Sequence, residues 1–277
     1  MLKEDEPITL MLLGSGVRFP AFIGALTAIE EKRLKVVRII GASAGSIVGC
    51  LYAAGKSPIA MRRLALEIDP TLFKDFSFSS LLRGKGLYEG KALERYIDGL
   101  LGGRRFCDDF SISPFVIATD ILNNTPFVFS RSNCPDMKVS TAIRFSSGIP
   151  FVFSYKQFKH EGKSHVFVDG NLMPGVVENM FAEEGRLLIL RVISTRTLAQ
   201  ATSETFTLKR YIKGLLLIML HAVEKERVKG KRWQDTILIS CGDIPPTKFT
   251  ISADEKRYLI EQGYLQTKEY LEYKWGI

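Results

Sequence analysis

Two strand-turn-helix patterns near the N-terminus constrain the fold of this chain most strongly. The apolar run Ile8–Leu13 is typical of a buried strand, ends at Gly14 and is followed by a helix-like segment. A second run, Val36–Ile40, leads through the sequence Gly-Ala-Ser-Ala-Gly at residues 41–45 into another helix-like segment, residues 46–54. Two such units within about 50 residues predict a parallel sheet flanked by helices.

The rest of the chain continues this alternation. The patterns predict helices over residues 57–67, 91–101, 206–229 and 252–263, the last ending at Gly263, and strands over residues 115–119, 125–130, 163–168, 186–193 and 236–240. No repeat, low-complexity segment or clear linker interrupts the 277 residues. We therefore expect one domain, residues 1–277, which the helices from about residue 206 onward complete.

Composition and charge bear on the partners and the cellular location of this protein. A net charge of +8 fits an anionic partner, such as acidic lipid, and fits equally well charges that only maintain solubility. No recognisable nucleic-acid-binding module is present, so no nucleic acid polymer is expected as a partner. The four cysteines are too dispersed for a metal pattern or a dense disulfide framework. Without a signal-peptide layout or an apolar run of about 18 residues, the protein is expected to be cytoplasmic.

Residues 41–45 match the Gly-x-Ser-x-Gly pattern of a nucleophile elbow. There a sharp strand-to-helix turn exposes the serine hydroxyl, and the flanking glycines, here Gly41 and Gly45, remove side chains that would clash. Ordinary glycine-rich turns share the pattern, but the strand before it and the helix after it favour Ser43 as a nucleophile. The glycine loop at residues 14–18 is a candidate anion cradle, because free N–H groups at a helix start attract negative oxygens. Together the two turns predict a serine hydrolase.

A serine nucleophile needs a base, and the three histidines are poor candidates. The order Ser43…Asp169…His221 matches an ordinary hydrolase triad, but His221 lies inside a long helical segment, whereas a triad histidine normally lies on a loop. His160 and His165 flank a hairpin-like turn and are expected to be solvated.

Asp169 is the stronger base candidate. It follows the predicted strand 163–168 and precedes Gly170, which places it at the edge of the sheet where ligands meet an open α/β fold. A simple Asp-Gly turn without chemistry fits the same pattern equally well.

At these positions the chain resembles the patatin-like phospholipase family over most of its length. The family's Gly-Gly-Gly-x-Arg/Lys-Gly loop corresponds to residues 14–19, its serine elbow to residues 41–45 and its Asp-Gly-Gly/Ala motif to residues 169–171. A segment like residues 142–150 also precedes the family's catalytic aspartate. Three ordered motifs at compatible spacing are far more specific than any one of them.

The sequence departs from the family pattern at three places. Ser15 and Asn171 replace smaller residues, and Phe19-Pro20 replaces the last glycine of the loop. None of these changes removes a reacting group. They predict a helix that begins at Pro20 and a loop that approaches the lipid less closely.

The resemblance implies a three-layer α/β sandwich with a central, mainly parallel sheet. It implies a lipid acyl hydrolase of the phospholipase A type with a Ser–Asp dyad, in which Ser43 attacks the ester carbonyl and Asp169 accepts its proton. The backbone N–H groups of Gly14, Ser15 and Gly16 would hold the oxyanion. Water then releases the acyl-enzyme, and neither a metal nor a cofactor is required.

Four further residues have supporting roles under this resemblance. Gly41, Gly45 and Gly170 flank the reacting groups. Arg18 occupies the family's basic position, where it supports the loop, meets a phosphate or forms a structural salt bridge.

The implied partner is a phospholipid membrane surface, with the protein peripheral at the inner membrane. The apolar segment 206–229 has basic residues on both sides, which suits an anionic bilayer surface. A core-facing helix with solvated ends fits the same pattern, and both hold if the helix borders the lipid entrance. The chain is also similar to compact bacterial family members that degrade membranes, some in antiphage defence switched on by cyclic nucleotides. A cyclic nucleotide activator is therefore one expected partner, and an oligomer is compatible with the same reading.

Two other functions fit parts of the pattern. One is an esterase or thioesterase that uses the same dyad on soluble acyl substrates. The other is a non-catalytic nucleotide- or lipid-binding module built on Gly14 and Gly16. The nucleotide version is weak, because Phe19 stands where a dinucleotide fingerprint has its third glycine and the second strand ends in Gly41 instead of an acidic residue.

Overall fold

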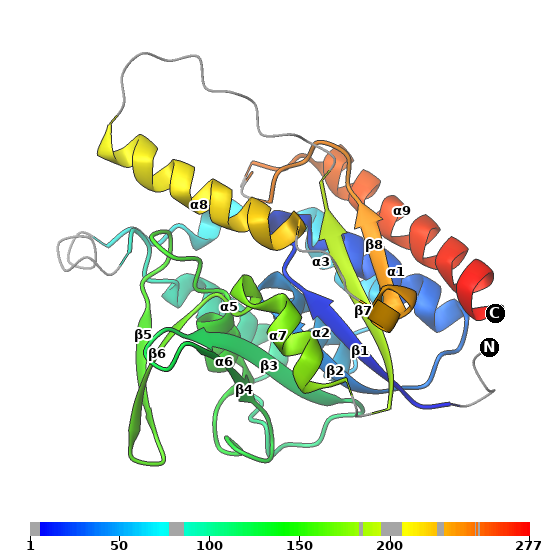
Figure 1. The fold of residues 1–277 in the computed structure, drawn as a ribbon, viewed down its shortest axis with the longest axis horizontal. Helices are drawn as coiled ribbons and strands as arrows, with labels where there is room; N and C mark the ends of the chain where they lie inside the picture. Colours follow the sequence, from blue (N-terminus) through cyan, green and yellow to red (C-terminus); the bar gives the residue numbers. More distant parts are fainter. Residues whose placement is uncertain are drawn as a thin grey trace.

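The computed structural model describes residues 6–77, 86–182, 185–194, 207–225, 230–246, 248 and 250–277. The strands are β1 (Ile8–Leu13), β2 (Val36–Ala42), β3 (Ser113–Asp120), β4 (Thr125–Phe129), β5 (Lys156–His160), β6 (Lys163–Val168), β7 (Arg186–Ile193) and β8 (Thr236–Ser240). The α-helices are α1 (Pro20–Glu31), α2 (Ala44–Ala53), α3 (Pro58–Glu67), α5 (Lys91–Leu101), α6 (Val139–Ser146), α7 (Pro174–Met180), α8 (Leu208–Lys225) and α9 (Ala253–Tyr270). The short helical turns are η1 (Gly16–Arg18), η2 (Pro70–Phe73), η3 (Gly170–Leu172), η4 (Gly230–Asp235) and η5 (Leu271–Trp275). The strands form one sheet and the helices lie around it, so the expected α/β fold is confirmed (Figure 1).

The sheet is mainly parallel, as expected. Its strand order is β5-β6-β3-β2-β1-β7-β8. Strands β2 and β6 pair with successive parts of one edge of β3, and β4 pairs with the opposite edge. Neighbours among β1, β2, β3, β7 and β8 are parallel, whereas β4, β5 and β6 join through antiparallel pairs. Parallel strands are normally covered on both faces, which explains why the apolar runs in this sequence are nearly continuous.

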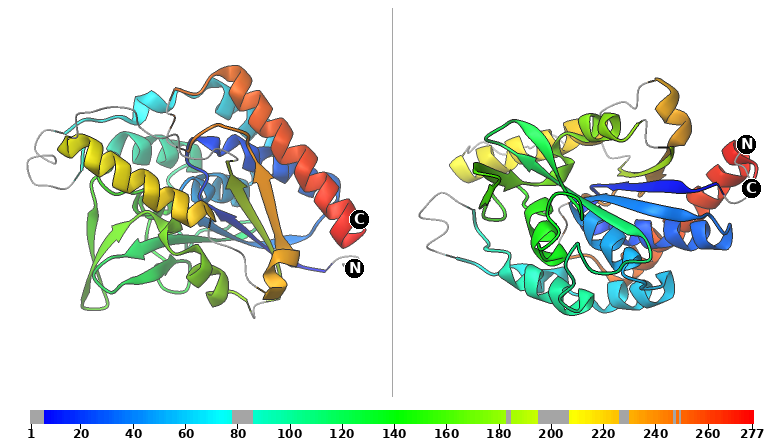
Figure 2. Two further views of the ribbon diagram at one scale, coloured as in Figure 1. Left: turned by 45° about the horizontal axis from the view of Figure 1, so that its top comes forward. Right: turned by 90° about the horizontal axis from the view of Figure 1, so that it is seen from below.

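The sheet is the middle of three layers. Leu10 and Leu12 of β1 pack into a larger core on one face, whereas Met11 and Leu13 pack with Val177 of α7 in a smaller core on the other. This separation follows from the alternation of side chains along a strand. Figure 2 shows α1 and α3 on one side of the sheet and α7 and α8 on the opposite side.

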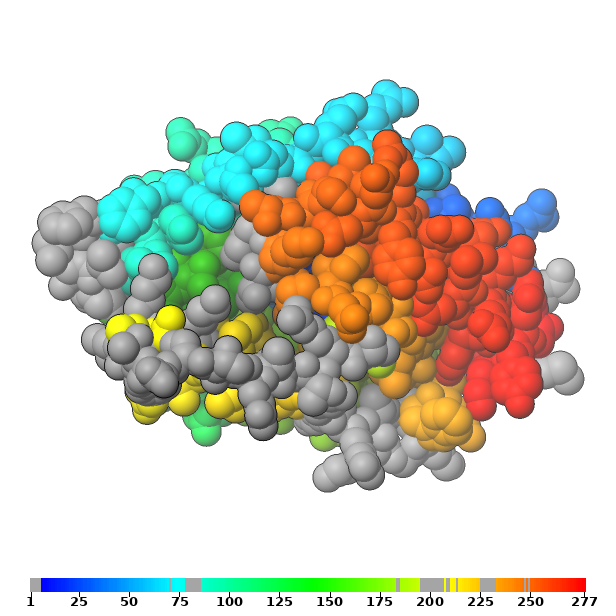
Figure 3. Space-filling model, turned by 90° about the horizontal axis from the view of Figure 1, so that it is seen from above, coloured from blue at the N-terminus to red at the C-terminus, as the bar shows by residue number. Residues whose placement is uncertain are grey.

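Helix α9 packs closely against α1, and this contact corrects one sequence prediction. Gly263 was expected to end the last helix, but α9 continues through it to Tyr270. A Cβ on Gly263 would lie 1.8 Å from the carbonyl oxygen of Ala21, and one on Gly24 of α1 would lie 1.8 Å from that of Ile260. Gly263 therefore permits close helix packing and is not a helix end. In Figure 3, α9 in red and the orange residues before it form much of the surface seen from above.

Three elements were missing from the predicted pattern: β5, α6 and α7. Strand β5 alternates exposed and half-buried residues at the edge of the sheet, so its charged composition hid it. The hairpin to β6 turns at Glu161 and Gly162, both with positive φ, as a two-residue hairpin requires. The long helix predicted at 206–229 is α8, and residues 206 and 226–229 lie outside the described part of the chain.

Candidate active site

Ser43 lies in a sharp turn between β2 and α2. Its backbone has φ 54° and ψ −131°, a region that residues with a side chain rarely adopt. A Cβ on Gly45 would lie 2.2 Å from the carbonyl oxygen of Leu12, and one on Gly41 would lie 2.4 Å from Cα of Ser46. Both glycines are therefore needed for the turn, which has the geometry of a nucleophile elbow.

Asp169 follows β6 directly and contacts Ser43. The Ser43 hydroxyl donates a hydrogen bond to Asp169 Oδ2 at 2.6 Å. Ser43 is 6% exposed and Asp169 3% exposed, so the bond is shielded from water. The structure thus joins the two residues that the sequence motifs singled out, although 126 positions separate them.

The two residues meet because β2 and β6 approach each other end to end along one edge of β3. Ala42, the last residue of β2, pairs with Ile117, and Val168, the last residue of β6, pairs with Thr119. Since β6 is antiparallel to β3, it runs toward the end of β2. Ser43 and Asp169 therefore come together because two strands of opposite direction converge. Asp169 lies at the C-terminal end of its strand, as predicted, but this strand is antiparallel to β3.

Contacts with β3 hold the turn after β6 in place. The Thr119 hydroxyl donates to the Asp169 carbonyl oxygen at 2.8 Å. A Cβ on Gly170 would lie 1.9 Å from the carbonyl oxygen of Ile117, so only glycine fits against β3 at that position. The Asp169 side chain consequently has little freedom to turn away from Ser43.

The environment of Asp169 suits a general base. Burial raises the pKa of this carboxyl to about 6, and hydrogen bonds from the Ser43 hydroxyl and the Asn171 N–H act in the opposite direction. The Asn171 N–H donates to Asp169 Oδ1 at 2.9 Å, which leaves Oδ2 facing Ser43. The carboxylate is thus ionised near neutral pH and more basic than an exposed aspartate.

The glycine loop lies beside the dyad with three consecutive left-handed residues. Gly14, Ser15 and Gly16 have φ of 71°, 90° and 56°. The Gly14 N–H donates to the Ala42 carbonyl at 3.2 Å, so this expected oxyanion donor is already engaged in the sheet. Among the described residues, the N–H groups of Ser15 and Gly16 have no acceptor. The structure narrows the candidate oxyanion donors to these two.

Arg18 is buried behind the loop and forms a salt bridge, one of the roles considered for it. Its Nη2 donates to Glu224 Oε1 of α8 at 2.5 Å, and its Nε donates to the Ser15 carbonyl oxygen at 3.2 Å. Its Nη1 has no partner within the part of the chain that the structure describes. Arg18 therefore supports the loop, while its Nη1 group keeps no acceptor among the described residues.

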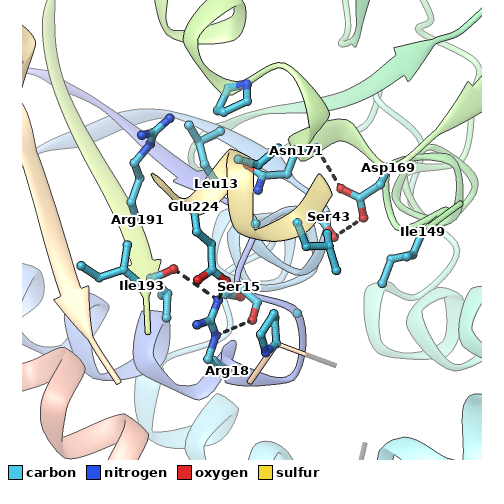
Figure 4. Close-up of a pocket in the computed structure, with 17 residues that line it drawn as sticks. Leu13, Ser15, Arg18, Ser43, Ile149, Asp169, Asn171, Arg191, Ile193 and Glu224 are labelled. Carbon is cyan, nitrogen blue, oxygen red and sulfur yellow. Dashed lines mark hydrogen bonds and ion pairs between the residues drawn. The ribbon is translucent and has the colours of Figure 1, made fainter. Parts of the chain in front are cut away.

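These groups line one small cavity of about 50 Å³. Figure 4 shows Ser43 and Asp169 on one side of it and Arg18 with Glu224 on another. Helix α8 closes the cavity with Leu220 and Val223, and the remaining lining residues are Leu13, Gly14, Ser15, Gly16, Ile149, Asn171, Pro174, Arg191, Val192, Ile193 and Pro246.

Sequence reasoning missed two serines that hold the elbow. The Ser43 N–H donates to the hydroxyl oxygen of Ser146 at 2.8 Å, and the Ser46 hydroxyl donates to the Ser43 carbonyl at 2.6 Å. Ser146 lies in the segment 142–150 that carries part of the family resemblance, so that segment contained the signal without a role attached to it. Glu224 gave no signal, because it is one acidic residue in a long helical pattern.

The histidines take no part in this cavity. His165 was expected to be solvated, and this was wrong: it is 7% exposed, and its Nδ1 lies 2.7 Å from Asp120 Oδ2. Its ring stacks on Phe167 and meets Phe127 edge-on. His165 thus belongs to a buried aromatic cluster beside β3.

Comparison with known families shows that one family model covers all of these motifs. The family model described as patatin-like phospholipase matches residues 10–184. This chain belongs to the patatin-like phospholipase family. Membership in this family supports a lipid hydrolase.

Individual proteins are similar to this chain over most of its length. The uncharacterized protein YqhO of Bacillus subtilis (strain 168) is 27% identical, and the match covers 93% of this chain and 96% of YqhO. The probable lipid hydrolase 463L of Invertebrate iridescent virus 6 is 23% identical, and the match covers 62% of each chain. The crystal structure of VipD from Legionella pneumophila has a TM-score of 0.65 at 14% identity, over 98% of this chain and 68% of VipD, and shows the shared fold.

The departures from the family's motifs have local explanations. Phe19 caps both η1 and α1, and Pro20 begins α1, so the helix starts directly after the loop, as predicted. Ser15 adopts the left-handed conformation without a Gly at that position. Asn171 packs against the loop, since a Cβ on Gly14 would lie 2.3 Å from Asn171 Nδ2. In this family member, Asn171 thus fills space next to the glycine loop.

Within the described ranges, no helix of this family member is long and apolar enough to cross a bilayer.

Proposed function

We propose that this chain is a lipid acyl hydrolase of the phospholipase A type with a Ser43–Asp169 dyad. The observation that carries the proposal is the 2.6 Å hydrogen bond from the Ser43 hydroxyl to a buried carboxylate, formed at a strained elbow. The same cavity is lined by Ser15 and Gly16, whose N–H groups have no acceptor among the described residues. A serine hydroxyl is a weak nucleophile until a base accepts its proton. Asp169 is the base that the geometry offers.

The reaction follows from these positions. Ser43 Oγ attacks the ester carbonyl as Asp169 Oδ2 takes the hydroxyl proton. The N–H groups of Ser15 and Gly16 then stabilise the oxyanion, an interaction whose loss typically costs about 2.7–4 kcal/mol of barrier for each donor. The protonated Asp169 donates to the leaving alcohol, and water, activated by the same carboxylate, releases the acyl chain from Ser43.

A phospholipid substrate is supported by the family match over residues 10–184. Arg18 stands at the family's basic position, but it is 1% exposed and pairs with Glu224, so its role is to support the loop. We favour phospholipids over soluble acyl esters and thioesters on the family match.

A membrane surface as partner is supported by exposed apolar side chains around the cavity. On α8, Tyr211, Leu215 and Ile218 are 48%, 44% and 60% exposed, at the spacing of one helical face. Phe76, Leu87 and Phe151 are also exposed, and backbone hydrogen bonds join the segments of Leu87 and Phe151. Figures 1 and 2 place α8 and these segments on the same part of the molecule. Such a surface suits the interface of an anionic bilayer, given the net charge of +8.

The deciding experiment is incubation of the purified protein with defined phospholipid vesicles and analysis of the products by mass spectrometry. We expect free fatty acid and lysophospholipid from the wild type and at least a 100-fold loss with Ser43→Ala or Asp169→Asn. Asp109→Asn, an exposed aspartate, is the matched control and keeps full activity. Near-full activity in either dyad variant would contradict the dyad. Hydrolysis of p-nitrophenyl esters or thioesters without release of fatty acid from vesicles would assign the protein to soluble substrates instead.

The same assay tests regulation. Addition of cyclic oligonucleotides should raise the hydrolysis rate if the protein is an antiphage effector of the cyclic nucleotide type. Unchanged rates across a panel of such compounds would contradict that role and leave the hydrolase assignment intact.

A further inference from the structure

Arg18 is a buried cation that joins the glycine loop to helix α8. It is 1% exposed. The Nη2 group pairs with Glu224 and also donates to the Val192 carbonyl at 3.4 Å, while Nε donates to the Ser15 carbonyl at 3.2 Å. One side chain therefore contacts the loop, β7 and α8 at once.

The contact with Ser15 sets the direction of an oxyanion donor. The Ser15 carbonyl and the Gly16 N–H belong to the same peptide unit, and a trans unit points these groups in opposite directions. No cis peptide occurs in the described ranges. The Ser15 oxygen accepts both from Arg18 Nε and from the Arg18 N–H at 3.1 Å. Arg18 thus fixes the face of the peptide on which the Gly16 N–H emerges.

The Gly16 N–H is a candidate donor to the oxyanion. It has no acceptor among the described residues, and Gly16 lines the same cavity as Ser43. Without the Arg18 side-chain contact, the Ser15 carbonyl would keep only its bond from the Arg18 backbone N–H, and the peptide could rotate more readily because Gly16 tolerates many backbone conformations.

Arg18 can hold this position only if its own charge is compensated. A buried cation without a partner is strongly destabilised, and a long arginine side chain loses rotamer freedom when it is fixed. Glu224 supplies the compensating carboxylate at 2.5 Å, and its side chain is only 14% exposed. Leu220 and Val223, on the same part of α8, line the cavity beside it.

We propose that Glu224 is a positioning residue, which orients the Gly16 N–H for the oxyanion through Arg18. The proposal rests on the hydrolase function proposed above. It adds to the catalytic machinery a residue of α8 that lies beyond the matched family segment, residues 10–184.

The test compares Glu224→Leu and Glu224→Gln with the wild type on a short, soluble p-nitrophenyl ester. Glu224→Leu should lower kcat by about 10- to 100-fold, somewhat less than the loss of a whole oxyanion donor, with KM changed less than about twofold. The kcat of Glu224→Gln should lie between those of Glu224→Leu and the wild type, because the glutamine amide oxygen still accepts a hydrogen bond from Arg18. The rate at which an alkyl fluorophosphonate labels Ser43 should fall by the same factor, since its phosphoryl oxygen needs the same donors.

Leu216→Ala is the matched control. Leu216 is buried on α8 and does not line the cavity, so its truncation lowers thermal stability without lowering kcat of the folded protein. The pH profile is a second readout. The acid limb set by Asp169 should stay in place in Glu224→Leu, because the dyad itself is unchanged.

The outcomes separate the two proposals. An active wild type and a folded Glu224→Leu protein with unchanged kcat and labelling rate would overturn the positioning role and leave the hydrolase standing. A rise in KM alone would also overturn it. A wild type that neither hydrolyses any ester nor labels at Ser43 would contradict the hydrolase function, and with it the role of Glu224.

Discussion

At the scale of single residues, the site combines a strained backbone with a buried charge. A left-handed residue with a side chain costs about 1–3 kcal/mol, and Ser43 keeps this conformation because Ser146 and Ser46 bond to its backbone on both sides. Asp169 is destabilised as an anion by its burial. Both costs place reactive atoms where a relaxed chain would not hold them.

The pKa of Asp169 predicts how hydrolysis depends on pH. The base must be ionised, so kcat/KM should fall as the pH drops through about 6. An unperturbed aspartate would place this limb near 3.8. Rates on a soluble ester between pH 4 and 8 measure the midpoint, and circular dichroism at each pH confirms that the protein stays folded. A limb near 4 would contradict the buried base.

Asp169→Asn should also raise stability at neutral pH. The folded pKa of Asp169 lies above its unfolded value, so the stability contribution is full below about pH 4 and is lost as the pH rises through about 6. Removing the charge avoids this loss, and we expect a gain of roughly 1–3 kcal/mol at pH 8 that shrinks toward pH 4. Urea unfolding at both pH values measures it. Lower stability than the wild type at pH 8 would argue against this account.

Ser43 and Asp169 could be predicted from the sequence because each sits in a short motif with local backbone rules. Glu224, Ser146 and the buried state of His165 could not, since their roles depend on contacts between distant segments. Gly14 could be predicted only in part. The motif placed it in the loop, but only the strand pairing reveals that its N–H bonds to Ala42.

At the scale of elements, the packing of α1 on α9 shows that one glycine can indicate a helix end in the sequence and a close helix contact in the structure. Gly263 in the sequence resembled a helix stop. In the structure the carbonyl of Ala21 occupies the space where its side chain would be. Strand β5 was not predicted, because its polar and charged residues lack the apolar pattern of a strand. Its pairing with β6 at the edge of the sheet defines it.

Gly263→Ala should therefore destabilise the fold. Its Cβ would lie 1.8 Å from a backbone oxygen that cannot move without shifting α1. We expect a loss of about 1–3 kcal/mol or more in the free energy of unfolding. Gly99→Ala in α5 is the matched control, because nothing lies within 4 Å of its Cβ and alanine favours a helix by about 0.5–1 kcal/mol. Equal effects of the two substitutions on urea unfolding would refute the packing explanation.

At the scale of the whole molecule, α8 has apolar residues on two sides. Leu220 and Val223 face the cavity, whereas Leu215 and Ile218 are exposed. The sequence could not decide between a core-facing and a membrane-facing helix, and the structure places apolar residues of α8 in both environments. The same helix thus borders the candidate active site and presents an apolar surface to the outside.

Charged substitutions on the outer side of α8 should weaken membrane binding. We expect Leu215→Asp combined with Ile218→Asp to lower binding to anionic vesicles by at least tenfold in a sedimentation assay, while hydrolysis of a short soluble ester is retained. Leu265→Asp, at a residue 48% exposed on α9, is the matched control and should bind normally. A similar loss in both proteins would show that α8 has no special role at the membrane.

The convergence of β2 and β6 has a consequence for how this candidate active site can diversify. The gap between Ser43 and Asp169 spans the step from Ile117 to Thr119 on a single strand. The strand ends that precede Ser43 and Asp169 are therefore held at two nearby positions of β3, and moving these ends apart would disrupt their pairing with β3. Changes in substrate preference must then come from the walls of the cavity, among which α8 and the segment around Ile149 are the replaceable parts.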